Sequence, residues 1–178
     1  MEQVVTKLPC LLALICLASA QIAHADEFAK LQCGADIAKA LIGQRSVNER
    51  VVVTEKRYAK LGLKHLGADE ISDNLSSIGW LICGAEYIVL VDRHNVIGDA
   101  MAVPAHSKAS PVFSGICRRG AKDLPDVIFA ILDAARAGDP LPATVAWKID
   151  QPHAKFVKIA TDGLLCPRSG IYTVDGGL

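Results

Sequence analysis

The chain has 178 residues, 51% of them hydrophobic, and its 19 basic and 19 acidic side chains cancel to a formal net charge of zero. A neutral chain has no electrostatic footprint for nucleic acid or for an anionic membrane surface, so neither is an expected partner. The sequence shows no internal repeat, low-complexity segment or interdomain linker. Residues 26–178 have the length of a single domain.

Residues 1–25 have the pattern of a cleavable signal peptide. Lys7 supplies the positive start, residues 8–20 form an apolar segment too short to cross a membrane comfortably, and Ala23-His24-Ala25 is a cleavage signature. A membrane anchor is the alternative interpretation. We expect a mature chain that begins at Asp26, is periplasmic or secreted, and has no membrane attachment after cleavage.

Four cysteines follow the predicted cleavage site: Cys33, Cys83, Cys117 and Cys166. An even number in an exported chain predicts two disulfides, and the wide spacings lack the close pairs typical of zinc sites. Cys83 and Cys117 are expected at opposite ends of a meander, which favours Cys33–Cys83 with Cys117–Cys166. Cys33–Cys166 with Cys83–Cys117 is the rival pairing if the strand order is shuffled.

The predicted fold class is α+β, with an antiparallel sheet and two helices packed on it. The sheet combines a meander over residues 77–118 with a hairpin over residues 144–160, and its turn after the first strand is expected at Gly84-Ala85. Short runs of β-branched and aromatic residues indicate the four strands of the meander. These are residues 78–83, 87–91, 96–103 and 112–117. The runs are too apolar for a sheet with one wet face, so helices should cover much of it.

Periodic apolar residues predict helices over residues 26–42 and 125–137, the second with Pro125 at its first position. The intervening chain predicts a short strand at residues 50–53, a helix at 55–61 and an irregular connection over 63–75.

Three residues of the predicted sheet stand out from the pattern. Trp80 and Trp147 each have apolar residues two positions away on the same face, which predicts that both point into the core. A ligand-stacking platform is the alternative interpretation of each tryptophan. Asp99 places a charge among apolar neighbours on its strand.

The motifs of common enzyme classes are absent from the sequence. There is no G-x-S-x-G, no H-E-x-x-H, no C-x-x-C-H and no glycine-rich phosphate loop, so no metal or cofactor is expected. His94 lies in a predicted turn beside Asp92 and near Asp99, and His106 follows in the next loop. A small exported hydrolase that uses Asp92, His94 or His106 is the alternative function.

The loop from Pro104 to Pro111 is the candidate binding element. Prolines bracket it and stiffen it, and it gathers the polar side chains His106, Ser107, Lys108 and Ser110. A stiff loop loses little ordering entropy on binding, so it suits insertion into the cleft of a partner. A plain hairpin connection, polar because it faces water, is the alternative interpretation.

The expected function is therefore that of an exported, non-catalytic binding protein whose partner is another exported protein. An inhibitor of a hydrolase is one form that such a protein takes. In size, export and sheet-plus-helix layout the chain resembles small periplasmic inhibitors of lysozyme-type enzymes, although no residue motif supports the resemblance. Polar residues clustered in a concave pocket would favour the hydrolase, and polar residues on a convex loop would favour the binding protein.

Overall fold

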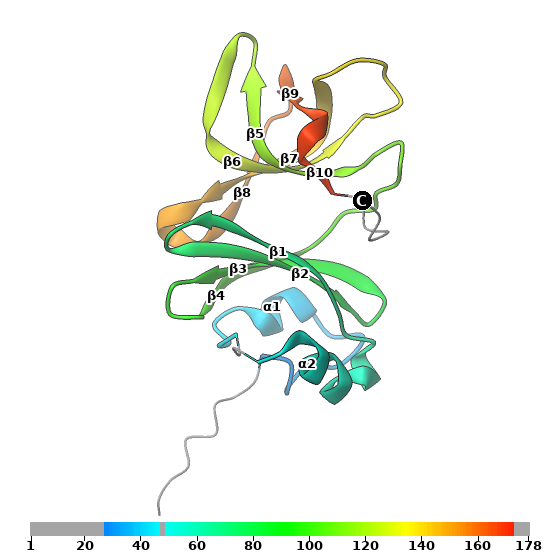
Figure 1. The fold of residues 1–178 in the computed structure, drawn as a ribbon, viewed down its shortest axis with the longest axis vertical. Helices are drawn as coiled ribbons and strands as arrows, with labels where there is room; N and C mark the ends of the chain where they lie inside the picture. Colours follow the sequence, from blue (N-terminus) through cyan, green and yellow to red (C-terminus); the bar gives the residue numbers. More distant parts are fainter. Residues whose placement is uncertain (1–26, 47–48, 173–178) are drawn as a thin grey trace, which may run out of the picture.

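The computed structural model describes residues 27–46 and 49–172, and these residues form three stacked layers (Figure 1). Short helices lie at one end, a four-stranded antiparallel sheet lies in the middle, and a six-stranded antiparallel sheet lies at the other end. The predicted signal peptide, residues 1–25, lies outside the described residues.

The helical layer comprises α1 (Ile37–Leu41), α2 (Val51–Arg57) and the 3-10 turn η1 (Ala59–Leu61). The Asp36 carboxylate caps α1 by accepting a hydrogen bond from the backbone N–H of Lys39 at 3.0 Å. The predicted helix over residues 26–42 is therefore much shorter than expected. Its N-terminal half is a series of turns around Gly34, whose φ of +91° a helix does not permit.

The strand predicted at residues 50–53 is wrong, because this segment begins helix α2. Its β-branched valines favour a strand by propensity, but tertiary packing overrides that preference. Thr54 is buried on the inner face of α2, and Tyr58 packs against the core next to the helix. The helix predicted over residues 55–61 is divided between the end of α2 and η1.

The middle sheet has the strand order β1-β2-β3-β4. Its strands are β1 (Lys64–Ser72), β2 (Leu75–Ile82), β3 (Ala85–Asp92) and β4 (Ile97–Ala102). Strand β1 replaces the irregular connection predicted over residues 63–75, and two register shifts within it conceal the period-two pattern. The turn between β2 and β3 is Cys83-Gly84, one residue earlier than predicted, and both residues have positive φ.

The second sheet has the order β10-β5-β6-β7-β8. Its strands are β5 (Val112–Arg119), β6 (Lys122–Leu132), β7 (Leu141–Asp150), β8 (Lys155–Ile159), β9 (Leu164–Cys166) and β10 (Ile171–Tyr172). Two 3-10 turns, η2 (Gln151–His153) and η3 (Arg168–Gly170), join its later strands. Strand β9 pairs with both β5 and β7, so β5, β6, β7 and β9 close into a ring.

The predicted fold class is confirmed in outline, as antiparallel sheet with two short helices, but two of its details are wrong. The meander over residues 77–118 does not form one sheet, because β5 belongs to the second sheet. The helix predicted over 125–137 is mostly strand β6. Pro125 lies where the β5–β6 register shifts. Proline has no backbone N–H to donate, and such an irregularity tolerates it because the ladder of hydrogen bonds is interrupted there.

Apolar side chains fill both interfaces between the layers, as well as the ring. Strand β3 shows the alternation: Val89 and Val91 pack against the helical layer, and Ile88 and Leu90 face the second sheet. The large buried side chains inside the ring are Phe113, Ile128, Leu132, Leu141 and Leu164. The middle sheet is thus covered by helices on one face and by a second sheet, rather than helices, on the other.

Both disulfides form in the preferred pairing. Cys33–Cys83 joins the helical layer to the β2–β3 turn, and Cys117–Cys166 joins β5 to β9 within the ring. Neither disulfide connects the two sheets.

Trp80 faces the core as predicted, with 6% of its surface exposed and its ring 5.0 Å from that of Phe28. Trp147 is only half-buried and packs beside Phe129 in the space between the sheets. The predicted core position is therefore confirmed for Trp80 and holds only in part for Trp147.

Asp99 connects the two sheets, which explains its charge among apolar neighbours. Its carboxylate accepts hydrogen bonds from the N–H groups of Phe156 at 2.9 Å and of Ala100 at 3.0 Å. The Lys155 ammonium lies 3.8 Å from the same carboxylate and donates to the Gly98 carbonyl at 2.6 Å. These contacts fasten the edge of β4 to the start of β8.

Candidate functional site

The polar loop runs from one sheet to the other, because β4 ends at Ala102 and β5 begins at Val112. It is a crossover between layers and not the turn of a hairpin. Backbone hydrogen bonds fix both of its ends. The N–H of Val103, just before the loop, donates to the Glu86 carbonyl of β3 at 2.8 Å, and the N–H of Leu132 in β6 donates to the Pro111 carbonyl at 3.0 Å. The loop is thereby held on both the middle sheet and the second sheet.

The tip of the loop is closed by its two serines. Ser107 and Ser110 exchange two backbone hydrogen bonds of 3.1 and 3.0 Å, and their hydroxyl oxygens lie 3.0 Å apart. The Ser107 hydroxyl also accepts from the N–H groups of Ala109 and Ser110, each at 3.2 Å. The backbone N–H and carbonyl groups of Ser107 and Ser110 are therefore paired within the loop, which favours a single conformation.

His106 folds back onto the middle sheet. Its Nδ1 lies 3.0 Å from the carbonyl oxygen of Pro104, and its Nε2 lies 3.4 Å from a carboxylate oxygen of Glu86. The two side chains of this pair are 19% and 20% exposed. Both ring nitrogens face acceptor oxygens, so His106 acts mainly as a brace for the loop and offers little surface to a partner.

The outward surface of the loop is formed by the residues after His106. Ser107, Lys108 and Ala109 are exposed, and Ser110 is half-buried. Lys108 lies at the tip, between the two serines that close it. The four predicted site residues thus divide into one brace, a pair that closes the tip, and one outward cation.

A cavity of about 80 Å³ opens between the two sheets beside this loop. Val103 and Val112, which flank the loop, both line it, as does Glu86 beneath His106. The other lining residues are Leu66, Gly67, Asp69, Ser77, Gly79, Tyr87, Ile88, Phe129 and Tyr172. Pockets that enclose small-molecule ligands usually measure about 300–1,000 Å³, so this cavity suits a single inserted side chain better than a whole substrate.

Asp92 and His94 lie at the opposite end of β3 from Glu86. Asp92 lies six positions along the strand from Glu86, which at 3.3 Å per residue is roughly 20 Å. His106 contacts Glu86 and therefore lies about as far from Asp92. The structure therefore does not assemble Asp92, His94 and His106 into one site. The Asp92 carboxylate accepts from the N–H groups of His94 at 2.8 Å and Val96 at 2.9 Å, so it shapes the turn.

Asp92 and His94 nevertheless line an open polar hollow of about 580 Å³ between the β3–β4 turn and η2. His153 lies on the same hollow, and its Nδ1 is 2.9 Å from an Asp150 carboxylate oxygen. Among the described residues, no Ser or Cys side chain of the hollow is hydrogen-bonded to either histidine. A Ser or Cys nucleophile hydrogen-bonded to a histidine base is thus not assembled there.

Residues 27–46 and 49–172 contain no group of three or more His, Cys, Asp or Glu side chains placed to hold a metal ion. Within the same ranges, no helix has both the length and the apolar character needed to span a membrane.

Comparison of the chain with protein-family models, curated proteins and solved structures found no match in any of the three. Its function must therefore be inferred from its own residues.

Two parts of this site escaped the sequence analysis. Glu86, the partner of His106, lies twenty residues upstream and on another strand, and only its charge beside the apolar run of β3 marked it. The cavity forms where β1, β2 and β3 of the middle sheet meet β5, β6 and β10 of the second sheet, which requires two sheets stacked face to face. A single predicted meander contains no such junction.

Proposed function

We propose that the protein is an exported, non-catalytic binding protein that engages another exported protein through the loop from Pro104 to Pro111. The observation that supports this proposal is the loop's double fixation: its ends are bonded to both sheets, and its tip is closed by Ser107 and Ser110. A loop fixed in this way has little conformational entropy left to lose when a partner binds.

The surface around the loop suits a protein partner in two further respects. Lys108 presents an exposed cation at the tip, and the small cavity beside Val103 and Val112 offers an apolar recess for one side chain. Central apolar pockets flanked by charged groups are typical of the residues that dominate protein–protein affinity. An inhibitor of a hydrolase would insert Lys108 into the enzyme's cleft.

The test is capture of partners from periplasmic and extracellular extracts by the immobilised mature chain, with quantification by mass spectrometry. Lys108→Ala should weaken the retention of a true partner by about 1–2 kcal/mol, whereas Lys122→Ala, a matched exposed lysine on β6, should not. A captured hydrolase is then assayed with and without the protein. Proteins retained equally by both variants, or none retained by the parent, would refute the loop as the contact surface.

The polar hollow supports a second candidate, a small exported hydrolase. The supporting observation is the pair formed by His153 and Asp150, which faces the same space as His94. A hydrolase would lose at least about 100-fold in rate with His153→Ala, because a positioned general base contributes about 10²–10⁴-fold. Equal activity of the parent and His153→Ala on a panel of ester, amide and glycoside substrates would rule this candidate out.

A further inference from the structure

In the helical layer the basic side chains are exposed and most of the acidic side chains are not. Residues 27–63 contain seven Lys or Arg and four Asp or Glu, and all seven cations are exposed. Of the four acids only Asp36 is exposed, and it caps α1. Glu49 binds Arg57 at 2.7 Å, and Glu55 accepts from the His65 N–H at 2.8 Å. The outer surface of this layer is therefore cationic, although the whole chain is neutral.

The same layer exposes apolar side chains in the first turn of α2. Val51, Val52 and Val53 are 37%, 73% and 43% exposed. Valine is among the residues most often found fully buried, so three exposed in a row are unusual. Helix α2 turns only Thr54 fully inward, so the valines are left on its outer side. We call the exposed valines together with the cations that follow them the α2 surface.

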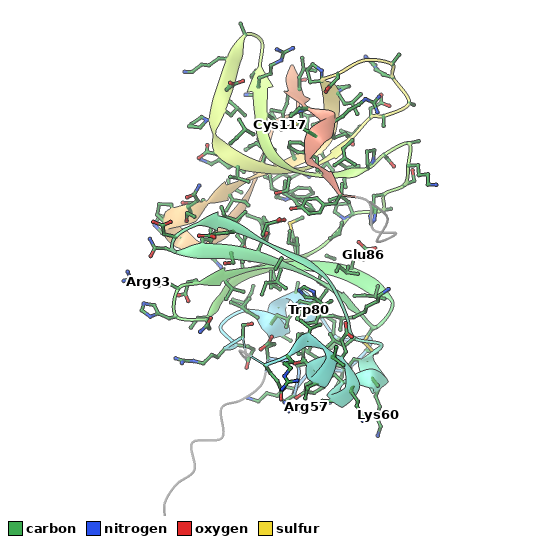
Figure 2. The ribbon with its side chains drawn as sticks, viewed as in Figure 1. Arg57, Lys60, Trp80, Glu86, Arg93 and Cys117 are labelled. Carbon is green, nitrogen blue, oxygen red and sulfur yellow. A yellow bond between two sulfur atoms is a disulfide. The ribbon has the colours of Figure 1, made fainter. Side chains whose placement is uncertain are left out.

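Helical spacing places these valines beside cations. Val52 and Lys56 are four residues apart, as are Val53 and Arg57, and residues with this spacing lie next to each other on one helical face. Lys60 follows in η1, and Figure 2 shows Arg57 and Lys60 at the end of the molecule farthest from the ring. The structure gives Lys56 and Lys60 no ion-pair partner among the described residues.

We propose that the α2 surface docks the protein onto an anionic phospholipid surface. Cationic side chains beside exposed apolar groups are the combination that binds at a lipid interface: the apolar groups enter the headgroup boundary and the cations pair with anionic lipids. The zero net charge does not oppose this, because salt screens charges beyond about 8–10 Å and the α2 surface senses only its own end of the molecule.

The orientation implied by this docking leaves the predicted binding loop accessible. The helical layer and the second sheet lie on opposite faces of the middle sheet, and the loop from Pro104 to Pro111 joins the middle sheet to the second sheet (Figure 1). A protein held by α2 would therefore present its ring and loop away from the lipid. The docking stands independently of the proposed protein partner.

The test is co-sedimentation of the disulfide-bonded chain with vesicles of phosphatidylcholine alone and of equimolar phosphatidylcholine and phosphatidylglycerol. We expect binding to the anionic vesicles only, and its loss at high salt. Lys56→Gln with Lys60→Gln should lower the partition coefficient by roughly thirty-fold, because each cation near an anionic surface contributes about fivefold.

Matched variants on the second sheet separate this surface from general charge effects. Lys122→Gln with Lys158→Gln removes the same charge from exposed positions and should leave the partition coefficient unchanged. Val52→Gln with Val53→Gln should weaken binding at constant charge, whereas Ile116→Gln with Val157→Gln, which are also exposed apolar residues, should not. Equal melting temperatures of the parent and the variants exclude unfolding as the cause.

Three results would overturn the proposal. The first is no sedimentation with anionic vesicles at low salt. The second is sedimentation that the second-sheet variants reduce as much as the α2 variants do. The third is that the α2 variants lose binding to a protein partner while their lipid binding is unchanged, because the α2 surface would then be a protein interface.

Discussion

Asp99 shows how a single charged side chain can hold two sheets together. Its carboxylate receives the N–H of Phe156 and is 18% exposed, so its removal leaves a poorly hydrated backbone donor on β8 without a partner. Asp99→Ala should lower the free energy of unfolding by about 1–3 kcal/mol. Asp99→Asn should lose less, because an amide oxygen can still accept that N–H. Chemical denaturation measures both variants, with the exposed Asp162→Asn as control, and an Asp99→Ala protein as stable as the control contradicts this role.

Gly170 is packed closely against strand β5. A Cβ added at this position would lie against the Phe113 ring and 2.7 Å from the carbonyl oxygen of Ser114. Both neighbours belong to a buried strand that cannot move aside easily, so Gly170→Ala should cost about 1–3 kcal/mol through overpacking. Ser169→Ala, at the exposed neighbouring position, should leave the melting temperature unchanged. A fully stable Gly170→Ala protein would show that η3 and β10 can shift away from the ring.

Trp80 belongs to the core between the helical layer and the middle sheet. Its ring packs against Phe28 and His65, with centroids 5.0 and 4.9 Å away. Trp80→Ala should therefore cost about 3–5 kcal/mol, as expected for a buried aromatic residue. Trp147→Ala should cost less, because Trp147 is only half-buried. Thermal unfolding that ranks the two variants in the opposite order contradicts the burial described for them.

At the scale of elements, the sequence predicted strands best where turn residues separate short apolar runs. Strands β2, β3 and β4 were placed within a few residues because glycines and turn residues separate their apolar runs. Strand β6 was predicted as a helix because it is buried on both faces, and a continuous apolar run fits either period. Val127, Phe129 and Ile131 face the middle sheet, and Ile128, Ala130 and Leu132 face the ring, so both halves of the run are used.

Helix α2 is the reverse error, a β-branched run that forms a helix. Arg50 provides no side-chain cap that would mark the start of the helix. The determinants are distant contacts, namely the burial of Thr54 and the packing of Tyr58 with Phe28. The loop from Pro104 to Pro111 could be singled out as a candidate because its signals are local. Glu86, which contacts His106, and the adjacent cavity depend instead on the stacking of the sheets.

The proposed function depends on the rigidity of that loop, and this rigidity can be measured directly. Ser107 accepts two backbone N–H groups and contacts the Ser110 hydroxyl, so Ser107→Ala should loosen the tip without unfolding the protein. We expect faster amide hydrogen exchange at Ala109 and Ser110 and a melting temperature within a few degrees of the parent, because surface changes usually alter stability by about 0.5 kcal/mol or less. Unchanged exchange at both amides would show that Pro104 and Pro111 alone fix the tip.

At the scale of the whole molecule, each disulfide serves one part of the structure. Cys33–Cys83 joins the helical layer to the middle sheet, and Cys117–Cys166 joins β5 to β9 in the ring. The two sheets are held together by apolar packing around Leu90 and Phe129, by the contacts of Asp99 and by the loop that crosses between them. The molecule therefore has two cores stabilised by separate covalent links.

This division predicts that removing each disulfide destabilises a different part of the molecule. Replacing both members of either disulfide with Ala should lower stability by about 2–4 kcal/mol, since each closes a loop of some fifty residues. Without Cys33–Cys83, hydrogen exchange should rise first in residues 27–63, because that layer can open while the ring stays folded. Without Cys117–Cys166, the rise should appear in residues 112–166 and spare the helical layer. Exchange that rises uniformly in both variants would mean that the layers unfold as one unit. Packing between the sheets would then couple the two cores more strongly than each disulfide stabilises its own core.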